Sequence, residues 1–384
     1  MSFSLTDEQS MIQSAARDFA MNEVLPIANE YDPERRDIPQ SLLAKLSEMG
    51  FFGITIPQEH GGLGLGSLEY CLVTEELSRA WMSVSSIIRP MLGYQAMTEA
   101  QKRIYLPKMA TGEMLFAFSM SEPGTGSDIS GLSTRAERDG DDWLITGNKY
   151  WCTNADGSDA ILVLARTEPV DRAKPHQGIS AFVVEKPRGE LPQGCAGAPI
   201  PKIGYFGWKT WELALDQCRV PHANMVSEPG RAFYLATSGL EVARAHTAAR
   251  AIGLARGGLE DAMQYALERV QFGRPIGEFQ AIRFKIAQMA TDIEAARQLL
   301  YSVCSKIDTG VRCDVEAAMV KLFATEMAER VTSEALQIHG GAGYTTHHAV
   351  ERYWRDARLT KIFEGTSEIQ LRVISDRLLG KPAA

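Results

Sequence analysis

The 384-residue sequence has no apolar run long enough to cross a membrane as a helix, which takes about 18 to 20 consecutive apolar residues. Its first nine residues, MSFSLTDEQ, also lack the basic start and apolar core of a secretion signal. These two absences argue against a membrane span and against export. We therefore expect a cytoplasmic protein.

Metal-ligating side chains are sparse, and excess positive charge is missing. The six cysteines and seven histidines are dispersed, so we expect neither a disulfide framework nor a metal site. The 40 Lys and Arg residues are outnumbered by 48 Asp and Glu residues, which gives a net charge of −8. A nucleic-acid partner normally needs clustered basic residues and is not expected. An anionic ligand would need a local basic pocket.

The length predicts two or three domains, and the sequence pattern changes twice along the chain. Residues 1–115 are helical in pattern, residues 116–228 are β-rich, and residues 229–384 are helical again. Strands and helices would have to alternate in a doubly wound sheet, so this order excludes one. No GxGxxG fingerprint lies between a strand and a helix either. We expect an α+β multi-domain protein.

Local signals support this division in the two helical segments. Thr6 to Gln9 have the form of a capping box before apolar residues at helical spacing. A second helix is predicted after Pro39 and should stop at Gly50. From Phe279 to Leu300 apolar residues recur at steps of three and four, which is typical of a helix packed in a bundle.

The β-rich segment consists of short runs separated by turn residues, which is typical of an antiparallel sheet. Trp143 to Thr146 and Lys149 to Thr153 are two of these runs, and Gly147-Asn148 is predicted to form a turn between them. Further runs cover 160–167, 179–185 and 211–215.

Two stretches of the β segment could hold a polar aromatic ligand. Residues 118–128, FSMSEPGTGSD, combine hydroxyls, glycines and free backbone N–H groups that could bind a phosphate or a polar ring edge. Such loops are more often simple turns. Trp151 lies at a predicted strand end beside Thr153, where its ring could cover one face of an aromatic cofactor. A core tryptophan is the alternative.

Two helical stretches carry candidate charges. Residues 269–275, RVQFGRP, form a basic and aromatic corner that could clamp a pyrophosphate or simply end a helix. Near the C-terminus an apolar pair precedes Glu364, and Thr366 or Ser367 could cap the last helix. Apolar surroundings would raise the pKa of the Glu364 carboxyl toward neutrality, as suits a general base. An ordinary surface glutamate is the alternative.

Taken together and in this order, five motifs resemble those of the acyl-CoA dehydrogenase family over essentially the whole chain. They are SEPGTGSD (121–128), WCTN (151–154), ERVQFGRPIGEFQ (268–280), QIHGGAGY (337–344) and FEGTSEIQ (363–370). The resemblance implies a flavoenzyme with an N-terminal helical domain, a middle antiparallel β domain and a C-terminal four-helix bundle. It also implies a homotetramer with FAD at each active site.

The resemblance assigns cofactor contacts residue by residue. Trp151 would lie against the isoalloxazine and Thr153 would bond near its N5. The loop that cradles the flavin and the thioester end would comprise Phe118, Met120, Ser121 and Ser127. Residues holding the ADP half across a subunit interface, and elsewhere along the cofactor, would be Arg269, Gln271, Phe272, Gln280, Gln337, Gly340, Gly341, Thr366 and Glu368.

The resemblance also implies a reaction. Glu364 matches the short- and medium-chain base and would remove the α-proton of an acyl-CoA thioester while flavin N5 takes the β-hydride. The product would be the 2-enoyl-CoA, and an electron-transferring flavoprotein would accept the electrons. Some relatives carry their base on the helix that here runs from about 238 to 253, but Ala243 occupies that position. Substrate contacts would include Ser127, Glu241, Arg244 and Gly365.

The sequence does not identify the acyl group of the substrate. Residues 77–101 are shorter than the family pattern in the region that lines the distal acyl pocket, and they contain Arg89. This arginine could pair with a distal carboxylate, as in relatives that act on dicarboxylyl-CoA, or it could be a solvated surface residue. The acyl chain could be short, branched, cyclic or dicarboxylyl. An acyl group tethered to a carrier protein, an oxidase, and a non-catalytic FAD- or acyl-CoA-binding subunit are the alternatives.

Overall fold

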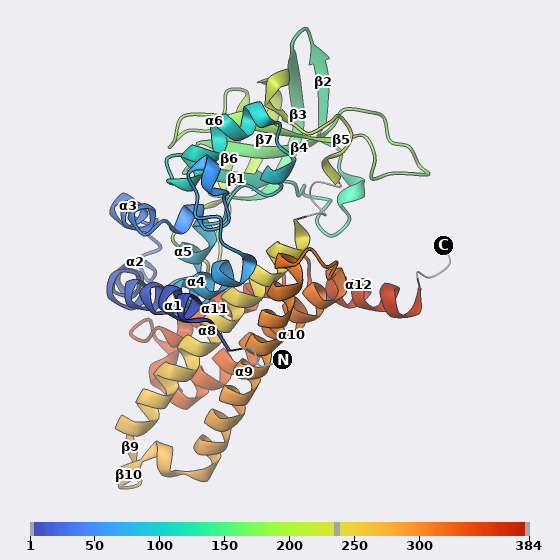
Figure 1. Ribbon diagram of the computed structural model, residues 1–384. Helices are drawn as coiled ribbons and strands as arrows, with labels where there is room; N and C mark the ends of the chain where they lie inside the picture. Colours follow the sequence, from blue (N-terminus) through green and yellow to red (C-terminus); the bar gives the residue numbers. More distant parts are fainter. Residues whose placement is uncertain (1–3, 234–238, 381–384) are drawn as a thin grey trace.

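The computed structural model describes residues 4–233 and 239–380, which form a helical part, a β-sheet part and a second helical part (Figure 1). The predicted order of helical, β and helical segments is confirmed. The expected helix start near residue 238 lies outside the described residues. The N-terminal helices are α1 (Asp7–Phe19), α2 (Leu25–Tyr31), α3 (Gln40–Glu48), α4 (Ser67–Ala80), α5 (Met82–Ile87) and α6 (Glu99–Ala110).

The local signals of the N-terminal part operate as predicted. The Thr6 side chain accepts a hydrogen bond from the Gln9 backbone, and the Gln9 side chain accepts one from the Thr6 backbone, so α1 begins with a capping box. Helix α3 begins directly after Pro39 and ends before Gly50. Helix α4 is buried on almost every face, because it lies between the N-terminal helices and the C-terminal bundle.

The middle part is one eight-stranded sheet of the described strands, in the order β6-β7-β3-β2-β4-β5-β8 with β1 beside β4. Most pairs are antiparallel, but β1 and β2 both run parallel to β4. The strands are β1 (Phe116–Ser119), β2 (Arg135–Asp139), β3 (Asp142–Thr153), β4 (Ala160–Arg166), β5 (Ile179–Glu185), β6 (Cys195–Pro199), β7 (Thr210–Pro221) and β8 (Met225–Val226).

The predicted turn at Gly147-Asn148 is wrong. Strand β3 runs unbroken through both residues and pairs with β7, with a register shift between Ile145 and Gly147. Gly147 has φ 152°, and a Cβ atom there would lie 2.6 Å from the Thr134 hydroxyl oxygen. The glycine therefore marks a β-bulge at a close approach to a neighbouring segment and not a chain reversal.

The C-terminal part is a bundle in which the long helices α8, α9 and α10 run antiparallel, with α11 and α12 packed on them (Figure 1). Its elements are α8 (Leu240–Glu268), β9 (Val270–Gln271), β10 (Arg274–Pro275), α9 (Gln280–Asp308), α10 (Asp314–His339), α11 (Val350–Thr360) and α12 (Ser367–Leu379). The predicted apolar face of α9 is confirmed, since Met289, Ile293, Ala296 and Leu300 are buried. At 1.5 Å per residue, α8 is about 43 Å long. The β9–β10 tip therefore lies at the end of the bundle away from the sheet (Figure 1).

Helices α4 and α8 pack unusually closely because small residues line their contact. A Cβ atom on Gly253 would lie 2.3 Å from the carbonyl oxygen of Glu75, and one on Gly257 would lie 3.1 Å from that of Arg79. No larger side chain fits at Gly253 without moving one helix. The backbone of α4 thus rests directly on α8.

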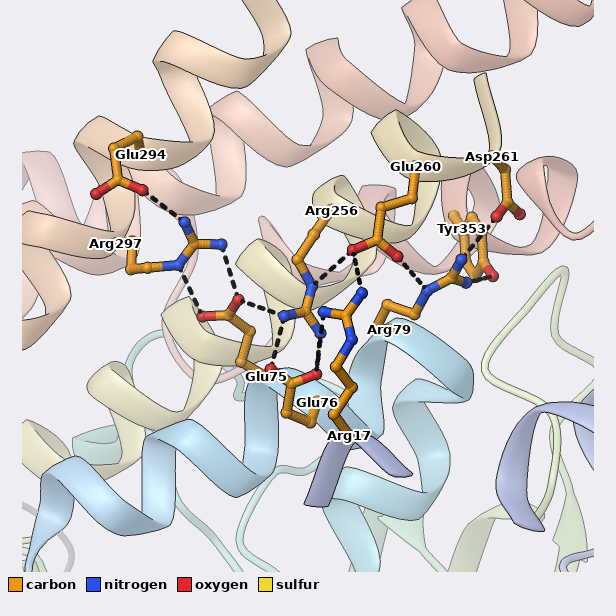
Figure 2. A network of polar contacts seen from close by, with 10 residues as sticks. All are labelled: Arg17, Glu75, Glu76, Arg79, Arg256, Glu260, Asp261, Glu294, Arg297 and Tyr353. Carbon is orange, nitrogen blue, oxygen red and sulfur yellow. Dashed lines mark hydrogen bonds and ion pairs between the residues drawn. The ribbon is translucent and has the colours of Figure 1, made fainter. Parts of the chain in front are cut away.

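A buried ionic network joins these two helices to the rest of the bundle (Figure 2). Arg256 of α8 binds both carboxylate oxygens of Glu76 and lies 3.4 Å from Glu75. Glu75 in turn accepts from Arg297 of α9 at 2.9 Å. Arg79 extends the network to Glu260 and Asp261 of α8 and to the Tyr353 hydroxyl of α11. Since both glutamates are about 1% exposed, their charges depend on these partners.

We predict that Glu76→Leu lowers the free energy of unfolding by about 3 kcal/mol, because it leaves the buried Arg256 charge short of its bidentate partner. Urea unfolding followed by circular dichroism measures this. Glu23→Gln is the matched control, because it removes one side of the exposed Glu23–Lys45 pair and should cost less than about 1 kcal/mol. Equal costs for the two variants would contradict a structural role for the network.

Candidate functional site

Glu364 lies in a tight turn between α11 and α12. Its φ is 54°, in the left-handed region that a side chain disfavours, and the following Gly365 has φ 91°, which glycine adopts without strain. The Gly365 carbonyl oxygen accepts hydrogen bonds from Lys321 Nζ (2.6 Å) and Gln370 Nε2 (2.9 Å). The turn is therefore fixed from two helices, α10 and α12. The Thr366 hydroxyl accepts from the Ile369 backbone and caps α12, which confirms one of the two predicted caps.

The Glu364 carboxylate faces two arginines. Its Oε1 accepts from Arg250 Nη2 at 2.7 Å and from Arg89 Nη1 at 2.8 Å, and its Oε2 accepts from the Thr247 hydroxyl at 3.0 Å. Arg250 and Thr247 lie on one face of α8, and Arg89 lies in the connection after α5. Three segments far apart in sequence therefore meet at one carboxylate.

The predicted apolar surroundings of Glu364 are therefore wrong. Burial alone would raise the pKa of this carboxyl, but the charges of Arg250 and Arg89 outweigh burial and hold it at about 2. The interpretation of Arg89 as a solvated surface arginine is also wrong, because its side chain is 32% exposed and ion-paired. Arg89 instead lines a small cavity together with apolar residues such as Met91 and Phe116.

Further titratable groups surround the carboxylate. The rings of Tyr70 and His246 stack 4.9 Å apart, and burial together with the Arg250 charge holds the pKa of His246 well below its ordinary value. Burial also lowers the pKa of Lys321 to about 8. The Arg250 guanidinium lies 4.5 Å from the Phe363 ring centroid. Cationic groups thus outnumber the single carboxylate.

Two predicted substrate residues lie where α8 begins, beside the start of α10. Arg244 is buried, donates to the Asp314 carbonyl oxygen at 3.3 Å, and has a pKa lowered by burial. Glu241 accepts from the Cys313 backbone at 3.2 Å. Ala243, at the alternative base position, is 7% exposed and brings no acid to the site. Ser127 is exposed on the loop after β1.

A buried ion pair that the sequence did not single out fixes the loop of residues 118–128. Glu122 accepts from Lys149 Nζ (3.1 Å) and from the backbone of Ser133 and Thr134 (both 2.8 Å). Burial would raise the pKa of Glu122, but Lys149 and these hydrogen bonds lower it to about 2. The partly buried Phe118, Met120 and Ser121 and the exposed Ser127 are therefore presented on a rigid support.

The residues around this loop fit the flavin that the resemblance implies. The Trp151 side chain is 55% exposed with φ 64°, so it is not a core tryptophan. The Thr153 hydroxyl lies 3.3 Å from that of Thr210. A flat ring edged with hydrogen-bonding groups suits an exposed indole beside such hydroxyls.

The residues expected to bind the ADP half lie together, but far from this loop. They fall in two stretches, 269–280 after α8 and 337–341 at the end of α10. Tyr265 near the end of α8 stacks on His339 at the end of α10 with ring centroids 4.4 Å apart, so the two stretches lie near each other. Along α8, Arg269 is about 28 Å from Arg250. All members are exposed, and Phe272 is 94% exposed with φ 50°. They are Arg269, Gln271, Phe272, Gln280, Gln337, Gly340 and Gly341.

A third group surrounds Glu364, and the sequence found only part of it. Gly365 and Thr366 adjoin the carboxylate, while Glu368 is exposed on the first turn of α12. Sequence reasoning missed Arg250, Thr247 and Lys321. The signal for Arg250 was a charged residue among the small and apolar residues of 248–255, where a core side chain is expected.

The part of the chain that the structure describes has no helix with the length and apolar character that spanning a membrane requires. In the same residues, no cluster of His, Cys, Asp and Glu side chains could hold a metal ion.

Comparison with known proteins gives three family models in chain order. The acyl-CoA dehydrogenase N-terminal, middle and C-terminal domain models match residues 6–113, 117–218 and 230–379. A (2S)-methylsuccinyl-CoA dehydrogenase of Cereibacter sphaeroides is 42% identical over 98% of this chain and 70% of its own.

Two solved structures are similar over nearly the full length. A chain from work on the electron transferring flavoprotein of Acidaminococcus fermentans has a TM-score of 0.93 and 38% identity, over 99% of this chain and 100% of that one. A glutaryl-coenzyme A dehydrogenase in complex with glutaryl-CoA has a TM-score of 0.92 and 34% identity, over 99% and 98% of the two chains.

The Glu364 ion pairs predict a pH-dependent stability. The folded pKa of about 2 lies below an ordinary value of 4.5, so the stabilisation is complete above about pH 5 and is lost as the pH falls toward 2. The stability advantage of the wild type over Glu364→Gln should shrink by about 2 kcal/mol between about pH 5.5 and 3 in urea unfolding. Glu48→Gln, at an exposed position, is the control and should show a smaller change. A constant difference for Glu364→Gln would contradict the paired carboxylate.

Proposed function

Because this chain belongs to the acyl-CoA dehydrogenase family, which consists of FAD-dependent oxidoreductases acting on CH–CH bonds, we propose that it oxidises an acyl-CoA thioester to the 2-enoyl-CoA with Glu364 as the base. The observation that supports this role is a carboxylate fixed on a doubly left-handed turn, at the point where α5, α8 and α10 meet.

Several residues of this chain take separate roles in the proton transfer. Glu364 takes the α-proton on a carboxylate oxygen, and its backbone N–H is assigned to the thioester oxygen, where negative charge develops. Lys321 holds the Gly365 carbonyl and so keeps this N–H in place. Arg244 and Glu241 at the start of α8 are assigned to the CoA arm, and Ser127 and the Gly365 backbone to the thioester end. A base whose pKa is about 2 abstracts such a proton poorly, so its arginine contacts must loosen in the reacting complex.

FAD, when bound, supplies the acceptor for the hydride that leaves the β-carbon. Trp151, Thr153 and the loop 118–128 would hold its flavin end. The residues at the far end of the bundle would hold the ADP half of the cofactor of a neighbouring subunit, because about 28 Å of α8 separates them from Arg250 in the same chain. We propose a homotetramer, the assembly that the family resemblance implies, whose chains have domains at 1–115, 116–228 and 229–384.

We assign the electrons to an electron-transferring flavoprotein. This assignment rests on the similarity to the chain from work on the Acidaminococcus flavoprotein, which extends over 99% of this protein. Release of hydrogen peroxide in air would instead indicate an oxidase, and activity only with carrier-protein thioesters would indicate a tethered substrate.

We predict that Glu364→Gln keeps bound FAD but loses flavin reduction by at least about 1000-fold, because the amide cannot take the α-proton. Anaerobic mixing with a panel of acyl-CoA thioesters, followed by flavin bleaching, measures this. Glu48→Gln, which alters an exposed residue of α3, is the matched control and should bleach like the wild type.

Normal bleaching of the Glu364→Gln variant would remove the assignment of the base. Absence of bleaching in the wild type with every thioester in the panel would instead favour a non-catalytic FAD- or acyl-CoA-binding subunit.

A further inference from the structure

The site around Glu364 has more positive charge than its own residues can balance. Arg250 and Arg89 both donate to the same oxygen, Oε1, at 2.7 and 2.8 Å. Lys321 adds a third cationic group, which donates to a carbonyl oxygen and not to a carboxylate. Glu364 is the one carboxylate in contact with any of these three groups within the described ranges. A second anion at this site would improve the charge balance.

Unused donors point to the same conclusion. Arg250 is 1% exposed, and its Nε has no hydrogen-bond partner among the described residues. The Tyr70 hydroxyl, buried and within the field of both arginines, also has none. A buried donor without a protein partner can bond to a water, an ion or a ligand. An incoming anion could accept from both.

In the free protein the Glu364 carboxylate already accepts from both arginines, so it competes with any incoming anion for them. While Glu364 holds both arginines, its pKa of about 2 makes it a poor proton acceptor. A neutral acyl chain offers the arginines no replacement partner. For such a substrate to react, Glu364 would have to give up two buried charge-assisted hydrogen bonds without compensation. The free carboxylate of a dicarboxylyl thioester can accept both hydrogen bonds in place of Glu364.

We propose that Arg250 and Arg89 form an anion clamp that Glu364 occupies in the free protein, and that a carboxylate of the substrate takes over this clamp and thereby releases Glu364 to act as base. No covalent bond changes in this exchange, and the site gains one negative charge. The substrate is then a CoA thioester of a short dicarboxylic acid, since its carboxylate must reach the place that Glu364 leaves while its α-carbon stays beside Glu364. Arg250 is a specificity-determining residue of this site.

This inference rests on the proposed function, and substrate preference provides its first test. Flavin reduction is followed anaerobically with two thioesters of equal length, succinyl-type with a free carboxylate and butyryl-type without one. We expect the wild type to prefer the dicarboxylyl thioester by at least about 30-fold. In Arg250→Gln this substrate should slow while the neutral one speeds up, so that the preference falls to within about threefold. Arg250→Lys should keep most of the preference, because it keeps the charge.

The Arg256→Gln variant tests whether the loss of any buried arginine of α8 changes the substrate preference. Arg256 lies on the same helix, is similarly buried and binds Glu76, away from Glu364. Its loss should lower the unfolding temperature and leave the ratio of the two substrates unchanged. Equal slowing of both substrates in Arg250→Gln would overturn the clamp, because a merely structural role predicts that result.

A binding measurement tests the clamp without catalysis. With Glu364→Gln as the holoenzyme, titration calorimetry should show the dicarboxylyl thioester binding at least about tenfold tighter than to the wild type, because its competitor has lost its charge. The neutral thioester should bind within about twofold of its wild-type affinity. Unchanged dicarboxylyl affinity would overturn the inference even where flavin reduction proceeds, and the proposed function would then stand alone.

Discussion

The close contact between α4 and α8 is the constraint on which the rest of the structure depends. Gly253 and Gly257 let the two backbones touch, and the glutamates of α4 then lie within reach of Arg256 and Arg297. Small residues make the contact possible, and in the observed register the buried arginines each meet a carboxylate. Arg89 follows α5, which follows α4 after a single residue, whereas Thr247 and Arg250 lie on α8. The geometry at Glu364 is therefore set by this helix pair.

The same physical rule operates twice in this molecule with opposite results. In the network of Figure 2, every guanidinium contacts at least one carboxylate, and positive charge is not in excess. At Glu364 the count is unequal, with two guanidiniums to one carboxylate, and the backbone that carries the carboxylate is itself strained. Unequal charge and strained backbone at one point are characteristic of sites where a fold gives up stability for chemistry. Both clusters include a buried arginine of α8, Arg256 in one and Arg250 in the other.

Patterns with a local cause were predictable from sequence, and long-range pairings were not. The capping box at Thr6, the cap at Thr366 and the apolar face of α9 depend on residues a few positions apart, and all three were predicted. Gly147 was mistaken for a turn because a bulge and a turn share the same local signal, and only the pairing of β3 with β7 distinguishes them. The pKa of Glu364 was predicted in the wrong direction because Arg250 and Arg89 lie 114 and 275 residues away in the sequence. Arg250 was missed for a similar reason, since nothing near it on α8 shows which carboxylate it meets.

The exposed Phe272 at the tip of two 29-residue helices has a genetic consequence. In the shared cofactor site that we propose, a chain with a damaged tip keeps its own Glu364 but impairs its neighbour, whereas a chain with a damaged Glu364 impairs only itself. Two inactive forms of the protein, one of each kind, would then complement each other when mixed, because some neighbouring pairs would contain one intact site. Whether a mutation is dominant or recessive would follow from whether it affects the tip or the site at Glu364.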